Sequence, residues 1–213
     1  MSAVSRKFFP NPRTTKTEND ILCVGGDLEP DILIEAYRLG IFPWPHEGLP
    51  LLWFCPEERG VLDFADLHLP KSFQKWLKKN EPQIEIKFNH DFKAVISQCA
   101  QKARPGQKGT WISKDIQKAY QELFKMGSAF CLECYRDTNL IGGIYGVRSE
   151  RYFSCESMFF NETNASKLAL YKLVEKLKVD GHTWVDIQMV TDVSGQFGGK
   201  LISKKKFLDR IKP

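Results

Sequence analysis

One segment of this chain constrains the fold more than any other, because it reads as a strand, a helix and a second strand. Residues 152–158 are strand-like, Asn164 begins a long amphipathic helix that Gly181 ends, and W-V-D-I-Q at 184–188 returns as a strand. A helix that connects two strands is the crossover unit of parallel and mixed sheets. We therefore expect a mixed sheet that this helix covers.

The same segment carries polar residues inside otherwise apolar strands: Glu156, Asp186 and Gln188. A carboxylate beside Phe153 and Met158 is unfavourable to bury without a partner, so it indicates a functional site or a specific ion pair. Asp186 and Gln188 are two residues apart, which places them on the same face of a strand. A face with a carboxylate and an amide is suited to holding an amine.

The first 60 residues differ from the rest, because they hold most of the prolines. One helix is expected between Pro30, which suits the first turn, and Gly40, which suits the stop, with Tyr37 in its apolar stripe. We predict a small N-terminal cap domain at 1–62 and a larger second domain at 63–213. The second part alternates helices (70–79, 91–102, 113–127) with strands (84–88, 130–135, 140–147), which predicts an α+β fold.

The basic residues are clustered, although the net charge of +5 is mild. Lys71, Lys75, Lys78 and Lys79 lie in one amphipathic helix, which favours a polyanionic partner because several phosphates are neutralised together. The alternative is a solvated helix face.

The six cysteines have apolar neighbours, and we expect neither disulfides nor a metal site. Cys131 and Cys134 have the C-x2-C spacing, but alternation along a strand directs their sulfurs to opposite faces. No apolar run approaches 18 residues, so no membrane span is expected, and a reducing cytoplasm is the expected location.

Eight motifs in a fixed order resemble the leucyl/phenylalanyl-tRNA–protein transferase family. The resemblance runs from Phe9 to about Phe207, and the combination of motifs is specific where each alone is weak. The motifs are G-G-D-L (25–28), E-A-Y-R-L-G-I-F-P-W (35–44), L-W-F-C-P-E-E-R (52–59), T-W-I (110–112), G-G-I-Y-G-V (142–147), E-S-M-F (156–159), N-A-S-K-L-A-L (164–170) and D-I-Q (186–188).

The resemblance implies a two-domain cytoplasmic enzyme whose larger domain is GNAT-like (acetyltransferase-like). Family members transfer Leu, Phe and less readily Met from aminoacyl-tRNA to the α-amino group of proteins that begin with Arg or Lys. The product is a degradation signal of the N-end rule pathway. No metal or organic cofactor is implied, no membrane is involved, and we expect a monomer.

The three polar residues suit attack of an amine on an ester. Asp186 is expected to orient the acceptor amine, directly or through Gln188, and to take its proton. Gln188 would place the amine or stabilise charge on the carbonyl. In the alternative mechanism the terminal hydroxyl of the tRNA transfers the proton, and Asp186 only binds the acceptor amine. Glu156 is expected to attract the positive charges of the acceptor, with a structural ion pair as the alternative.

The donor side chain is apolar, so its pocket must select by shape and burial. The expected walls are Trp53, Ile144, Phe153, Met158 and Leu170, with ordinary core as the alternative for some of them. Trp111 follows a basic loop and is expected to stack on the terminal adenine, unless it is a plug between the domains. The four lysines of helix 70–79 are expected to contact tRNA phosphates.

The chain departs from the family pattern at several positions. Val193 stands in place of a histidine, Gln196 and Phe197 replace a Ser-Leu pair, and Phe130 stands where histidine is frequent. These changes leave the acceptor preference open. The rival functions are another aminoacyl-tRNA-dependent transferase, a coenzyme-A-dependent N-acyltransferase and a tRNA-binding module without turnover. The coenzyme-A class needs an R/Q-x-x-G-x-G/A turn, which is missing before Asn164.

Overall fold

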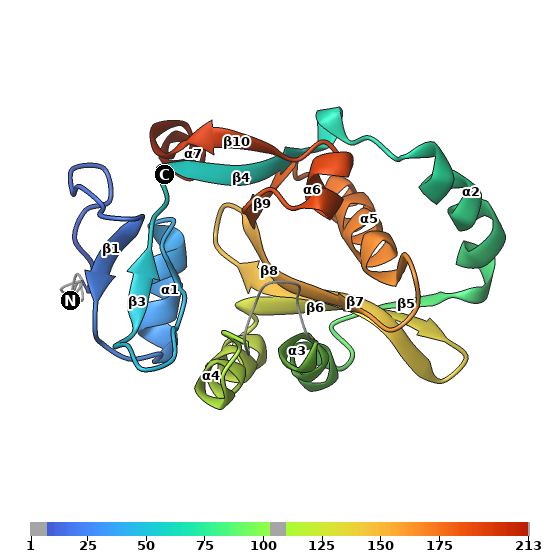
Figure 1. Ribbon diagram of the computed structural model, residues 1–213, viewed down its shortest axis with the longest axis horizontal. Coiled ribbons are helices and arrows are strands. Elements are labelled where there is room, and N and C mark those ends of the chain that lie inside the picture. The colour runs from blue at the N-terminus through green and yellow to red at the C-terminus, as the bar shows by residue number, and fades with distance from the viewer. Residues whose placement is uncertain (1–7, 103–109, 213) are drawn as a thin grey trace.

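Two β-sheets organise the protein. The computed structural model describes residues 8–102 and 110–212. Within these residues a three-stranded sheet has the order β1-β3-β2, and a seven-stranded sheet has the order β10-β4-β9-β8-β7-β6-β5 (Figure 1).

The N-terminal unit consists of the small sheet and one helix. Its elements are β1 (Ile21–Val24), α1 (Pro30–Arg38), β2 (Phe42–Pro43) and β3 (Leu52–Phe54). The helix begins at Pro30 as predicted and buries Leu33, Ala36 and Tyr37. This unit lies at one end of the large sheet (Figure 1).

The large sheet is antiparallel except at one pair of strands. Its strands are β4 (Glu58–Asp63), β5 (Glu85–Phe88), β6 (Ala129–Arg136), β7 (Asn139–Arg148), β8 (Phe153–Phe160), β9 (Trp184–Gln188) and β10 (Lys200–Ser203). Strands β8 and β9 are parallel and are joined by α5 (Ala165–Val179). The predicted crossover and the predicted α+β class with a mixed sheet are therefore confirmed.

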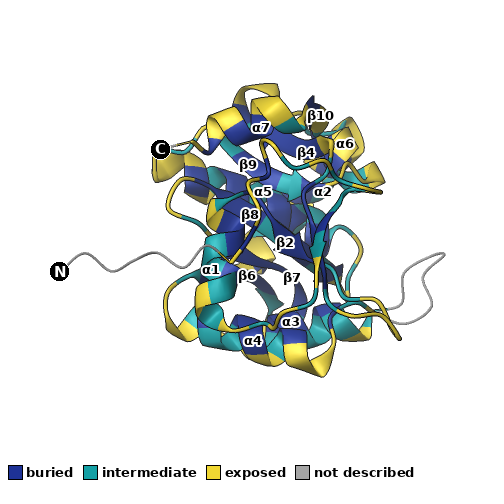
Figure 2. Ribbon diagram, turned by 90° about the vertical axis from the view of Figure 1, so that its left-hand side faces the viewer, coloured by how far each residue is buried: buried dark blue, intermediate teal, exposed yellow. Residues whose placement is uncertain are grey.

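Helices cover both faces of this sheet. The remaining helices are α2 (Lys71–Asn80), α3 (Phe92–Gln101), α4 (Lys114–Lys125), α6 (Asp192–Gln196) and α7 (Lys204–Arg210), with 3-10 turns at Phe64–Asp66 and Glu81–Gln83. Figure 1 shows α3 and α4 on one face and α5 on the other. One core cluster lies under α3 and α4 and continues into the N-terminal unit, and a second lies under α5. Buried residues follow the strands, while α3 and α4 turn exposed residues outward (Figure 2).

Strand β4 belongs to the large sheet. It pairs with β9 on one side and β10 on the other, so a boundary at residue 62 falls inside a paired strand. We propose that the division between the two units lies before Glu58.

The structure bears on several further expectations from the sequence. Cys131 packs in the core under α3 and α4, whereas Cys134 packs in the core under α5, as alternation required. Across the residues that the structure describes, no group of His, Cys, Asp or Glu has the arrangement of a metal site. No helix within 8–102 or 110–212 has the length and apolar character needed to cross a bilayer. Asn164 precedes α5 as predicted, but its φ is 69° and its side chain makes no capping bond.

A β-bulge in β8 sets the direction of Glu156. Tyr145 pairs with Ser157 and Gly146 pairs with Cys155, so Glu156 is the extra residue on β8. Bulges bend a strand and redirect a side chain, and they are frequent beside active sites. A Cβ on Gly146 would lie 2.0 Å from the carbonyl oxygen of Ser154, so only glycine permits this close approach.

Candidate active site

The three predicted polar residues lie together at the junction of β8 and β9. These strands meet where Ser154 pairs with Asp186. The Ser154 hydroxyl lies 3.0 Å from Oδ2 of Asp186 and 3.2 Å from Oε1 of Glu156. The side-chain amide of Gln188 donates to the same Oε1 of Glu156 at 2.8 Å. The structure thus joins Glu156, Asp186 and Gln188 in one hydrogen-bonded cluster.

Arg59 on β4 is the partner of Asp186. Its Nε donates to Oδ1 at 2.9 Å and its Nη2 donates to Oδ2 at 2.7 Å. The two side chains are 1% and 0% exposed. The guanidinium lies between the rings of Phe42 and Phe207, 4.5 and 4.7 Å from their centroids. Arg59 ends the L-W-F-C-P-E-E-R motif, but no pattern in the sequence assigns it to the site.

All of the strong acceptor positions of Asp186 are occupied. Besides Arg59 and Ser154, the backbone N–H of Gln188 donates to Oδ1 at 2.9 Å. Gln188 adopts a φ of 57° in doing so, which is a left-handed conformation that L-residues rarely adopt. Burial acts to lower the pKa of Arg59, but the Asp186 carboxylate outweighs it and raises that pKa. Arg59 therefore stays charged and holds Asp186 and the backbone of Gln188 in place.

Glu156 has a different environment, although it belongs to the same cluster. Burial raises the pKa of Glu156 to about 7, against the hydrogen bonds from Tyr37 and Gln188, which lower it. Its Oε2 is buried and makes no well-formed hydrogen bond among the described residues. The carboxyl group is therefore poised to gain and lose a proton near neutral pH.

Four of the five predicted donor-pocket residues share one core cluster. Ile144 and Phe153 are buried beneath α5, Leu170 is a buried residue of α5 itself, and Met158 packs half-buried against this cluster. Trp53 lies in the other core cluster, where its Nε1 donates to the carbonyl of Gly25 at 2.9 Å. The structure does not bring Trp53 together with the other four.

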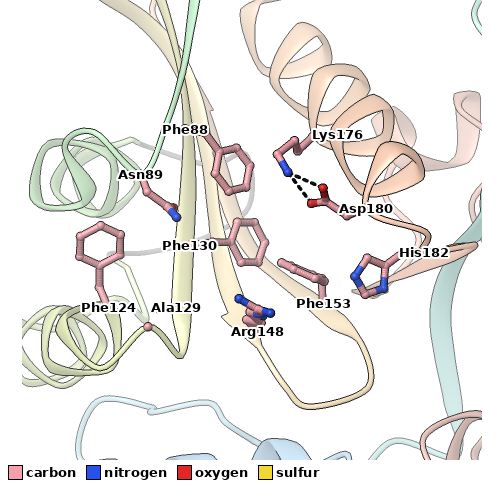
Figure 3. Close-up of a pocket in the computed structure, with 11 residues that line it drawn as sticks. Phe88, Asn89, Phe124, Ala129, Phe130, Arg148, Phe153, Lys176, Asp180 and His182 are labelled. Atoms are coloured by element: carbon pink, nitrogen blue, oxygen red, sulfur yellow. Dashed lines mark hydrogen bonds and ion pairs between the residues drawn. The ribbon is translucent and has the colours of Figure 1, made fainter.

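A cavity of about 500 Å³ opens beside Phe153 (Figure 3). Phe88 and Phe130 line it, and His182 meets the Phe153 ring edge-on at a centroid distance of 4.9 Å. Arg148 lies at its rim, where Lys176 and Asp180 form an ion pair. Of the five predicted donor-pocket residues, only Phe153 lines this cavity.

The residues predicted to contact tRNA lie on the surface or partly on it. Lys71, Lys75, Lys78 and Lys79 are all exposed on α2. Trp111 is half-buried and packs against the core that continues into the N-terminal unit. Most of the basic loop before it, residues 103–109, lies outside the described residues.

The positions that depart from the family pattern have mostly structural surroundings. Phe197 is fully buried and packs on Phe73, with ring centroids 5.4 Å apart. Phe130 is also buried and packs on Phe153. Gln196 is exposed and accepts a hydrogen bond from Lys167 at 3.3 Å, and Val193 is half-buried.

Two similar solved structures have low sequence identity to this chain. A ribosomal-protein-alanine N-acetyltransferase from Brucella melitensis biovar Abortus 2308 has 14% identity and a TM-score of 0.39, over 53% of this chain and 85% of that chain. The L-PGS from Bacillus licheniformis has 11% identity and a TM-score of 0.45, over 78% of this chain and 52% of that chain. These scores are too low to support an argument about function.

Relatives with known names share about 40% of their residues with this chain. A relative named leucyl/phenylalanyl-tRNA--protein transferase from Pseudomonas aeruginosa (strain UCBPP-PA14) is 40% identical over 99% of this chain and 92% of its own length. Another of that name from Syntrophus aciditrophicus (strain SB) is 43% identical over 96% of this chain and 84% of its own. The family profile for leucyl/phenylalanyl-tRNA protein transferase matches residues 61–212, and that for its N-terminal domain matches 26–57. This chain therefore belongs to the leucyl/phenylalanyl-tRNA protein transferase family.

Proposed function

We propose that this protein transfers Leu, Phe and less readily Met from aminoacyl-tRNA to the α-amino group of proteins that begin with Arg or Lys. The product would carry an N-end rule degradation signal, and the enzyme would act in the cytoplasm as a monomer. The observation that supports this most is the buried cluster of Glu156, Gln188, Ser154 and Asp186 at the β8–β9 junction.

The reaction needs positioning more than a strong base. An α-amino group has a pKa near 7.7–8, so about a tenth to a fifth of it is already neutral at pH 7. The aminoacyl ester is an activated acyl donor. Correct placement of the two reactants contributes several kcal/mol, up to about 7–11 in the best cases.

Glu156 is the proton acceptor in this proposal. Both oxygens of Asp186 accept hydrogen bonds from buried donors, whereas Glu156 has a pKa near neutrality and an Oε2 without a well-formed hydrogen bond from the described residues. The α-ammonium group loses one proton to Glu156, and its lone pair forms the new C–N bond with the ester carbon. The bond from that carbon to the ribose oxygen then breaks, and the ribose oxygen takes the second proton that the nitrogen loses.

Asp186 and Gln188 position this step. Asp186 fixes the backbone of Gln188, whose side-chain amide donates to Oε1 of Glu156. Gln188 thereby orients the carboxylate toward the incoming amine. The alternative allocation, in which Asp186 removes the proton itself, requires Asp186 to exchange its bond with Arg59 for one with the amine.

The donor side chain enters where β8 and β9 diverge. The two strands pair only at Ser154 and Asp186, and beyond this point Met158 and Ile187 are half-buried at the edge of the core under α5. Ile144, Phe153 and Leu170 belong to the buried core that Met158 and Ile187 pack against. A wall that includes a flexible thioether accepts both branched and aromatic guests, which suits Leu, Phe and Met.

A coenzyme-A-dependent reaction is the second candidate, but the N-terminus of α5 argues against it. A pyrophosphate site needs closely approaching backbone N–H groups and usually glycine. Residues 161–164 (N-E-T-N) contain no glycine, and the carboxylate of Glu162 lies there, paired with Arg136 at 3.0 Å. The Glu162 carboxylate would repel the negatively charged pyrophosphate of coenzyme A.

One assay separates these functions. The protein is incubated with radiolabelled Leu-tRNA and model proteins that begin with Arg, Lys, Asp or Glu, and with acetyl-coenzyme A in a parallel reaction. Label on the Arg and Lys acceptors, lost in Glu156→Gln, supports the proposal. Label that stays on bound tRNA indicates a binding module, and acetylation indicates the second candidate.

A further inference from the structure

The small N-terminal unit reaches the polar cluster through Tyr37 on α1. This side chain is 1% exposed, and its hydroxyl lies 2.5 Å from the hydroxyl of Tyr120 on α4, which is 0% exposed. Tyr37 also interacts through its side chain with Glu156. A short chain of groups thus runs from Glu156 through Tyr37 to Tyr120, and it joins two helices and a strand.

A hydroxyl group both donates and accepts, so the hydrogen bonds from Glu156 through Tyr37 to Tyr120 can run in either direction. When Glu156 is ionised, Tyr120 donates to Tyr37 and Tyr37 donates to the carboxylate. When Glu156 is protonated, its buried Oε2 needs an acceptor, and the Tyr37 hydroxyl is available if it donates to Tyr120 instead. Oε2 has no well-formed bond to the described residues, which agrees with an interaction that changes between the two states.

We propose that Tyr37 and Tyr120 are positioning residues that form a reversible hydrogen-bond chain to Glu156, by which the N-terminal unit sets the pH range of transfer. This inference rests on the proposed function of Glu156 as proton acceptor. Neither tyrosine loses its proton: each phenolic O–H only turns from one partner to the other.

Among the groups that surround Glu156, the two tyrosine hydroxyls are free to change their hydrogen-bonding direction. From β9, Asp186 raises the pKa of Glu156, and from β4, Arg59 lowers it, but these two groups are locked to each other. The Cys155 thiol and the Tyr152 hydroxyl also lie near the cluster, and burial raises the pKa of each, so both stay neutral. Tyr152 donates to the backbone carbonyl of Tyr37 at 2.7 Å rather than to a carboxylate.

The test is the pH dependence of kcat/KM in Tyr37→Phe and Tyr120→Phe, with Leu-tRNA and an acceptor peptide that begins with Arg. Loss of a hydrogen bond to the charged carboxylate shifts the ascending limb to higher pH, by about one pH unit in Tyr37→Phe and by less in Tyr120→Phe. Because the two hydroxyls form one chain, the double variant should shift no further than Tyr37→Phe. The proposal is overturned if the shifts of the two single variants add in the double variant. It is also overturned if the ascending limb of the single variants stays at the wild-type pH.

Tyr152→Phe is the matched control, because it removes an equally buried hydroxyl beside the same helix. It should lower Tm without moving the limb. A second measurement does not depend on turnover: carboxyl ¹³C NMR titration of Glu156, assigned from the Glu156→Gln spectrum, should show a higher midpoint in Tyr120→Phe. If the wild-type protein transfers no label at all, the proposed function fails. If it transfers label and the midpoints coincide, only this inference fails.

Discussion

The guanidinium of Arg59 binds both carboxylate oxygens of Asp186, at 2.9 and 2.7 Å, across two neighbouring strands. Because Phe42 and Phe207 enclose the guanidinium, the pair connects the polar cluster to the N-terminal unit and to α7. Removal of one partner from a buried pair leaves an uncompensated charge, whereas the intact pair adds little net stability. Its main effect is to fix geometry.

Arg59→Gln should therefore lower the free energy of unfolding by about 3–5 kcal/mol, because Asp186 is left buried without its cation. Urea denaturation measures this change. The matched control is Arg210→Gln, which removes another Arg–Asp pair with two hydrogen bonds, to Asp63, near the surface. That loss should be about 1 kcal/mol or less. Equal losses would contradict the role given to burial.

The raised pKa of Glu156 predicts a pH-dependent stability difference. Its pKa in the folded protein is about 7 against an ordinary value of 4.5, so the folded state favours the protonated form. This contribution is complete at low pH and is lost as the pH rises through 7. Relative to wild type, Glu156→Gln should gain about 2 to 3 kcal/mol of stability between pH 5 and pH 8. A difference that does not change with pH would show that Glu156 has an ordinary pKa.

Asp186→Asn separates positioning from proton transfer. The variant keeps the shape of the side chain but weakens its hold on Arg59, so kcat should fall. The ascending limb of the pH profile should persist and move to lower pH, because Glu156 still accepts the proton but has lost the nearby negative charge that raises its pKa. In Glu156→Gln the limb near 7 should be lost, and any residual rise should follow the acceptor amine, whose pKa is near 7.7–8. If the limb is lost in Asp186→Asn and kept in Glu156→Gln, then Asp186 is the proton acceptor.

The sequence was sufficient for the parts of the site that depend on local pattern. Glu156, Asp186 and Gln188 could be recognised because each is polar within an apolar strand, and the crossover helix between their strands predicted that these strands are neighbours. Arg59 could not be recognised, because its partner is 127 positions away and its neighbours Glu57 and Glu58 suggest an ordinary exposed turn.

Two further features depend on contacts between distant elements. Tyr37 fits the apolar stripe of α1, and only the fold shows that its hydroxyl meets Tyr120 from another helix. Trp53 packs in the core that continues into the N-terminal unit, whereas the other expected walls of the donor pocket pack under α5. Contacts between distant elements carry no periodic signal in a single sequence.

Met158→Ala tests the proposed entry of the donor side chain. Truncation removes apolar surface from the edge between β8 and β9, and the loss of burial should raise KM for Leu-tRNA about tenfold to a hundredfold. The KM for the acceptor peptide should stay unchanged. Met126→Ala, which truncates an exposed methionine after α4, is the control and should alter neither constant. If only the KM for the acceptor peptide changes, Met158 lines the acceptor site and not the donor site.

The exposed lysines of α2 should contribute to tRNA affinity through phosphate contacts alone. Lys71→Glu combined with Lys75→Glu should raise KM for aminoacyl-tRNA, and the dependence of log affinity on log salt should flatten by about 0.7–0.9 for each phosphate that the helix no longer neutralises. The control is Lys114→Glu with Lys118→Glu, which makes the same charge change on exposed positions of α4. If both pairs flatten the salt dependence equally, the interaction depends on net charge and α2 has no specific place in it. If only the α2 pair does so, the tRNA lies along this helix.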